Sequence, residues 1–131
     1  MKEFMLYIRN LPENFSKLSA QSQQDFLESC RVYINQLKEE GHLIAAQPMD
    51  RSGKMISGSA STSFKEGPYN EGPEVIVGYY HILAKDLDEA TVIAKQNPEF
   101  SFSTTARIEV RPIKMKEETT GFEYPKERMK I

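Results

Sequence analysis

The stretch that decides the fold is EGPYNEGPEVIVGYYHILA, residues 66–84. Gly67 and Pro68 predict a sharp, stiff turn, because Gly tolerates positive φ and Pro fixes φ at about −65°. The segment from Glu74 to Ala84 then carries the strongest strand pattern of the chain, an almost unbroken apolar and aromatic run. A central strand that follows a turn is therefore the reference point for placing the other elements.

Strand patterns recur on both sides of this segment. Residues 4–9 alternate apolar and mixed side chains, which is typical of a half-buried strand. Residues 42–49 predict a second strand, residues 50–58 a turn or short hairpin, residues 59–64 an edge strand, and residues 104–113 the last strand. Together these segments predict an antiparallel sheet.

Two amphipathic helices separate the strands. The first begins at Ser19 or Ser22, both acceptable N-caps, and ends at Gly41. The second begins at Asp86, with a glutamate three residues later in the reciprocal capping position, and ends at the Asn97-Pro98 pair. The resulting order, β-α-β-(β)-β-α-β, is the ferredoxin-like split βαβ plan of an α+β domain.

This plan places both helices on one face of the sheet and leaves the other face open. We expect one domain over residues 1–113 and a charged C-terminal arm over residues 114–131, whose Phe122, Tyr124 and Ile131 suggest docking. The open face is too apolar to remain wet, so we expect a homodimer packed sheet to sheet, with a ligand cavity at the interface.

The same residues resemble a known family. The carriers are Glu66-Gly67-Pro68-Tyr69, Gly78-Tyr79-Tyr80, Asp86-Leu87-Asp88-Glu89-Ala90 and Ile108-Glu109-Val110-Arg111-Pro112. In this order they resemble the DGPF subgroup of the YCII-related proteins over residues 3–113. The resemblance implies a dimeric α+β barrel. It also implies that some relatives use a His–Asp acid–base couple, whose helical His falls near Cys30 here, while Glu66 replaces the Asp of the turn.

Composition excludes several classes of function. The net charge of −2 gives no electrostatic reason to expect nucleic acid or a membrane as partner. The single cysteine, Cys30, excludes an intramolecular disulfide and favours a reducing, cytoplasmic location. With only two histidines and no phosphate-binding loop, we expect no metal site and no cofactor.

Polar side chains on the open face are the candidate site. Alternation places the charged residues of the last strand on the same face as the half-buried positions of the first and central strands. The predicted ligand-binding residues are Tyr7, Arg9, Tyr79, Glu109 and Arg111, and the candidate acid–base residues are Glu66 and His81. A pocket with these side chains suits a small polar or anionic molecule, because arginine binds carboxylates in a bidentate manner.

Each candidate also has a structural interpretation. Glu109 and Arg111 can form an ion pair without any ligand, His81 can be a satisfied interface residue, and Glu66 can accept hydrogen bonds from the amides of its turn. Besides ligand binding, the sequence leaves two functions open. One is a cofactor-free enzyme of the dimeric α+β barrel type, and the other is an accessory or regulatory protein whose arm 114–131 contacts a partner.

Overall fold

The computed structural model describes residues 1–61 and 63–125. The elements in chain order are β1 (Lys2–Asn10), α1 (Ala20–Glu39), β2 (Leu43–Pro48), β3 (Lys54–Ser59), β4 (Ser63–Pro68), β5 (Val75–Ala84), α2 (Leu87–Lys95), the 3₁₀ helix η1 (Pro98–Ser101) and β6 (Arg107–Pro112). The predicted order of the two helices and of the four strands of the main sheet is confirmed, and the predictions between residues 50 and 74 differ from the structure.

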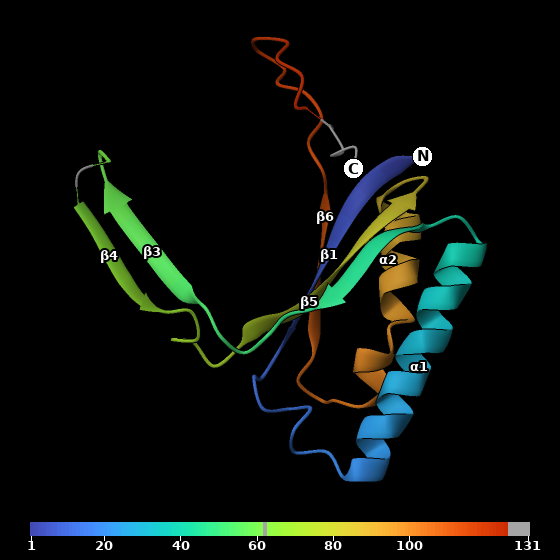
Figure 1. Ribbon diagram of the computed structural model, residues 1–131. Helices are drawn as coiled ribbons and strands as arrows, with labels where there is room; N and C mark the ends of the chain where they lie inside the picture. Colours follow the sequence, from blue (N-terminus) through green and yellow to red (C-terminus); the bar gives the residue numbers. More distant parts are fainter. Residues whose placement is uncertain (62, 126–131) are drawn as a thin grey trace, which may run out of the picture.

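Four strands form one antiparallel sheet in the order β2-β5-β1-β6. Without the β3–β4 pair this is the ferredoxin-like order, in which the third strand of the sheet lies between the first and second. Both α1 and α2 cover the same face, and the opposite face carries no helix (Figure 1). The α+β fold class is therefore confirmed.

The helices begin and end where local chemistry satisfies their backbone. Ser19 caps α1, because its hydroxyl accepts from the Ser22 amide at 3.1 Å. At the other end Gly41, with φ of 77°, and His42 donate backbone hydrogen bonds to Lys38 and Leu37. This pair of bonds is a Schellman motif, and its left-handed position favours glycine.

The core lies between the sheet and the two helices. Phe4, Leu6 and Ile82 are buried at the centre of the sheet, and Tyr33 and Leu37 of α1 pack against them. A bulge in β5 opposite Ile8 and Arg9 shifts its alternation by one residue. Odd-numbered positions are buried before the bulge (Val75 and Val77), and even-numbered positions are buried after it (Tyr80 and Ile82). At this point Gly78 lets β2 approach closely, because a Cβ there would lie 3.1 Å from the Gln47 carbonyl oxygen.

The β3–β4 hairpin projects away from the sheet (Figure 1). Two predictions are wrong here. Glu66 and Gly67 are paired within β4, opposite Ile56 and Met55, and the chain turns only at residues 69–74. Pro68 fits because it ends a strand, where a missing amide is tolerated. The predicted edge strand 59–64 contains the hairpin turn instead, since Ala60 and Ser61 have φ of 50° and 60°.

Beyond β6 the chain forms a small irregular loop that extends away from the helices (Figure 1). An isolated bridge joins Lys116 and Glu123, and the rings of Phe122 and Tyr124 meet at 5.3 Å. Both aromatic side chains are exposed, and Ile131, the third predicted docking residue, lies outside the described residues. No helix in the described part of the chain is both long and apolar enough to span a membrane.

Candidate functional site

The open face of the sheet gathers six of the seven predicted site residues. In the strand register Tyr7 lies beside Tyr79 on one side and Glu109 on the other, while Met5 lies between His81 and Arg111. Arg9 follows two residues after Tyr7 on the same face of β1. Antiparallel pairing thus brings these polar side chains together on one surface.

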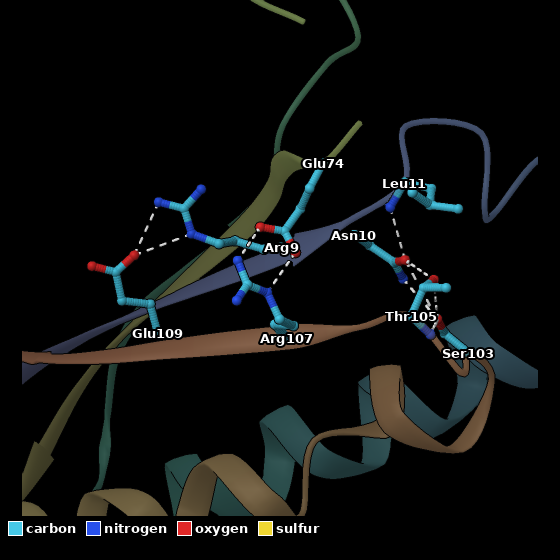
Figure 2. A network of polar contacts seen from close by, with 8 residues as sticks. All are labelled: Arg9, Asn10, Leu11, Glu74, Ser103, Thr105, Arg107 and Glu109. Atoms are coloured by element: carbon cyan, nitrogen blue, oxygen red, sulfur yellow. Dashed lines mark hydrogen bonds and ion pairs between the residues drawn. The ribbon is translucent and has the colours of Figure 1, made fainter. Parts of the chain in front are cut away.

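The arginines of this face already contact carboxylates. Arg9 donates from Nε and Nη2 to Oε1 of Glu109 at 3.1 and 2.9 Å, and Arg111 donates to its other oxygen at 3.1 Å. Arg107 binds Glu74 through two hydrogen bonds of 2.7 Å (Figure 2). The hydrogen bonds from Arg9, and then the one from Arg111, hold the pKa of Glu109 below its ordinary value. The ion-pair interpretation of Glu109 and Arg111 therefore fits the geometry.

His81 has a partner that the sequence analysis did not identify. Its Nε2 lies 2.8 Å from Oε1 of Glu3, and both side chains are mostly covered. Glu3 could have been found, because it alternates with Met5 and Tyr7 on β1 and so lies on the same face. A carboxylate that orients an imidazole is an arrangement used for acid–base chemistry.

Glu66 does not belong to this group. It lies on β4 of the projecting hairpin, is largely exposed, and forms an ion pair of 2.8 Å with Lys54 (Figure 1). The hydrogen bonds of the described residues do not include one from the turn amides to its side chain, so the ion pair replaces the expected turn-capping contact.

The other face of the sheet contains a cleft of about 1090 Å³. It is bounded by the loop after β1, by α1, by the end of β2 and by η1. None of the seven predicted site residues is among those that line it. A hollow of this size, lined mainly by apolar side chains, is typical of a small-molecule site.

Aromatic rings form one wall of the cleft. Phe26 of α1 lies between Phe15 and Phe102, with ring centroids 5.9 and 5.4 Å away. On the sheet side Tyr80 lines the cleft and meets Tyr33 edge to face at 5.4 Å. Both contacts have the tilted geometry that aromatic pairs prefer.

The floor of the cleft is polar. Asn97 is 3% exposed, and its Oδ1 accepts from the Glu99 amide at 2.8 Å. Its Nδ2, also buried, makes no hydrogen bond among the described residues. Tyr33 donates to the Ile93 carbonyl at 2.7 Å, and burial raises the pKa of both Tyr33 and Tyr80 while Asn97 opposes the rise. Because this donor is itself buried, a molecule in the cleft does not reach it, and the neighbours of the Asn97 side chain are the hydroxyls of Tyr33 and Tyr80.

Cys30 and Glu99 complete this floor. Burial, and then the nearby Glu99 carboxylate, raise the pKa of the Cys30 thiol to about 11. The thiol is therefore neutral at physiological pH, as expected for a cysteine on the apolar stripe of a helix. Glu99 Oε2 accepts from Asn10 Nδ2 at 2.7 Å.

Asn10 fixes the loop that carries the floor. It is fully buried at the end of β1, and its Oδ1 accepts from the Leu11 amide at 2.8 Å and the Thr105 hydroxyl at 2.6 Å. Its Nδ2 also donates to the Ser103 hydroxyl at 3.1 Å (Figure 2). One side chain thus joins the sheet to the segment after η1. The only sequence feature at this position is the end of an alternating strand.

Metal binding has no support in the described part of the chain, where no group of three His, Cys, Asp or Glu side chains is placed to hold an ion. His42 is partly buried, with Nδ1 2.8 Å from the Leu83 carbonyl oxygen. The chemistry available is therefore that of an apolar cleft with a polar floor, and of an oriented imidazole on the open face.

Sheet order, helix placement and cleft together define a small ferredoxin-like α+β protein with room for a small ligand. A family model places it more closely, because the YCII-related domain matches residues 3–114. The chain belongs to the YCII-related family. Its assignment to the DGPF subgroup stays a prediction.

One solved structure with the same fold is 5-chloro-2-hydroxyhydroquinone dehydrochlorinase from Burkholderia phenoliruptrix, in complex with 2,5-dihydroxybenzoquinone. The two chains are 16% identical, with a TM-score of 0.53, over 86% of this chain and 93% of the other. At this identity the likeness establishes the fold alone. No curated protein sequence matches the chain.

Proposed function

We propose that this YCII-family protein binds a small, largely apolar molecule in the cleft between its sheet and helices. The observation that carries the proposal is the cleft itself, about 1090 Å³ in volume, with the aromatic rings of Phe15, Phe26 and Phe102 along one wall. The dehydrochlorinase of the same fold, solved with a small ring compound bound, supports this use of the scaffold.

The experiment measures binding of 2-naphthol, a small ring compound with one polar atom, by isothermal titration calorimetry. Leu27 lines the cleft on α1 and is 57% exposed, whereas Val32 lies on the same helix outside the cleft and is 54% exposed. Leu27→Trp partly fills the cleft and should weaken binding about 10-fold or more, and Val32→Trp should leave binding unchanged. Equal affinity in the two variants would contradict the assignment to the cleft.

A second candidate site is the open face, and the observation that favours it is the 2.8 Å contact between His81 and Glu3. In this proposal two copies pair through their open faces, in the cytoplasm, and enclose a polar or anionic ligand among Tyr7, Arg9, Tyr79, Glu109 and Arg111. His81 would then act as acid or base, and Glu66, which lies on the hairpin, would have to come from the partner copy.

Two measurements test this second candidate. Sedimentation equilibrium should give a dimer for the full chain and a monomer for Tyr79→Arg, because a charge at the centre of the face opposes its burial. A full chain that is monomeric would contradict the second candidate site, because that site needs two copies. If 2-naphthol binds at the open face, Arg111→Ala should weaken its binding and Leu27→Trp should not, which is the reverse of the result expected for the cleft.

A further inference from the structure

We infer that the ligand of the cleft carries a carboxylate on an apolar body, and that Arg51 at the edge of the cleft binds this carboxylate. This inference rests on the proposed function, because it names the class of molecule that the same cleft would take. It is carried by the hydrogen bonds of Arg51, whose partners in the described part of the chain include no carboxylate.

Arg51 differs from the other described arginines in its partners. Each of the others forms an ion pair with a glutamate: Arg9, Arg31, Arg107 and Arg111. Arg51 instead donates from Nε to the carbonyl oxygen of Pro12 at 3.1 Å, and from Nη1 to the carbonyl oxygen of Met49. Both acceptors are neutral. Within the described residues, the positive charge of Arg51 is therefore not part of an ion pair.

The same hydrogen bonds place the guanidinium at the cleft. Pro12 follows β1 and Met49 follows β2, and both residues line the cleft together with Arg51. The guanidinium therefore joins two walls of the cleft at its edge, and Arg51 is exposed, so a bound molecule can reach it. Nη2 makes no hydrogen bond to the described residues, which leaves its two N–H groups as donors for a ligand.

Other charges at the cleft make the inference specific to Arg51. The other charged residues that line the cleft are Glu13, Arg31, Lys38, Asp50 and Glu99. Glu13 and Arg31 are already in ion pairs with residues of the same chain. The carboxylates of Asp50 and Glu99 oppose an anion that lies loosely in the cleft. A carboxylate therefore gains affinity only in direct contact with a guanidinium, where charge-assisted hydrogen bonds form.

The aromatic wall sets the body of the ligand. Phe26, held between Phe15 and Phe102, presents an ordered ring surface, and a flat ring placed on it makes the offset or edge-to-face contacts that aromatic groups prefer. Phe15 lies three residues after Pro12 in the loop that Arg51 holds. The aromatic wall and the cationic edge thus suit the two ends of one amphipathic molecule.

The experiment compares three probes that share a phenyl ring and a flexible butyl chain and differ in charge, namely 4-phenylbutyrate, 4-phenyl-1-butanol and 4-phenylbutylamine. Their binding to the full chain at pH 7 is measured by isothermal titration calorimetry. We expect the acid to bind at least about 5-fold more tightly than the alcohol, and the amine to bind most weakly. A charge-assisted hydrogen bond is roughly twice as strong as a neutral one, and the exposure of Arg51 limits the gain.

Arg51→Gln should remove this preference and bring the affinity ratio of acid to alcohol below about 2. The ratio is the readout because a displaced loop would weaken both probes alike, whereas loss of the guanidinium weakens only the acid. Arg51→Lys retains the charge without the planar fork and should keep an intermediate ratio. Arg107→Gln removes an exposed arginine from the open face and should leave the ratio as it is.

The outcomes separate this inference from the proposed function. Equal affinity of the full chain for the three probes, or an unchanged ratio in Arg51→Gln, would overturn carboxylate recognition and leave binding of 2-naphthol in the cleft intact. An acid whose affinity is the same in Leu27→Trp as in the full chain binds outside the cleft, and this result would also overturn the inference. Absence of binding for all three probes would overturn it as well, while 2-naphthol still decides the proposed function.

Discussion

At the scale of single residues, Asn10 is the side chain on which the site depends most. Its amide joins the end of β1 to Glu99, and to Ser103 and Thr105 as Figure 2 shows. Asn10→Ala removes these bonds, leaves buried polar atoms unpaired, and should lower the free energy of unfolding by about 3 kcal/mol. Urea denaturation measures the change. The exposed Asn70 is the matched control, and a loss as small as that of Asn70→Ala would contradict the role of Asn10.

Cys30 should be a slow nucleophile. Burial raises its pKa from 9.0 to about 11, which lowers the thiolate fraction about 100-fold and raises the reactivity of each thiolate by nearly 10-fold. Alkylation by iodoacetamide at pH 8 should therefore be about 10-fold slower in the folded chain than in urea, as followed by mass spectrometry. Equal rates would mean that the thiol is not held in this environment.

The ion pairs of Glu109 on the open face should make the stability of the folded chain fall at low pH. The pKa of Glu109 is lowered from 4.5 in the folded chain, so its contribution is fully present above pH 4.5 and is lost as the pH falls toward its folded pKa. Glu109→Gln should therefore lower the urea midpoint at pH 7 and have a much smaller effect at pH 3. A difference that is the same at both pH values would show that the carboxylate is not paired in solution.

Alternation along the strands predicted the open-face residues, because the period of two is a property of the backbone. The same argument could have included Glu3. The cleft was not predictable in this way, since its floor depends on contacts between β1 and residues about 90 positions later. Sequence spacing indicated only that Asn97-Pro98 ends a helix, and the burial of Asn97 is visible only in three dimensions.

At the scale of elements, the end of α1 depends on Gly41. Its φ of 77° strains any residue with a Cβ, although a Cβ would meet no atom within 4 Å. Gly41→Ala should lower the free energy of unfolding by about 1–2 kcal/mol through the backbone alone. Gly72→Ala is the control in urea denaturation, because its φ is ordinary and its Cβ would be in loose contact. A stability loss no larger than the control would contradict this explanation.

Helices and sheet strands were predicted well because capping residues and apolar periods are local. The hairpin was not, because residues 54–59 and 63–68 are almost all exposed and carry no burial pattern. In such a segment pairing between β3 and β4 decides the structure. The prediction of a turn at Gly67 and Pro68 relied on residue type alone. It was wrong because both residues pair within the hairpin.

At the scale of the whole molecule, the sheet separates two different surfaces. The open face has arginine and glutamate side chains that satisfy one another, and the helix face has an apolar cleft with aromatic rings along one wall. The first surface suits contact with a second copy, and the second suits a small molecule. Membership of the YCII-related family fixes the fold and leaves the choice between these surfaces to experiment.

The most direct test of the central claim is a crystal structure of the full chain with 2-naphthol bound. We predict that the ring lies in the cleft against Phe26. A probe bound instead on the open face, beside Tyr79 and Arg111 with the cleft empty, would contradict the account.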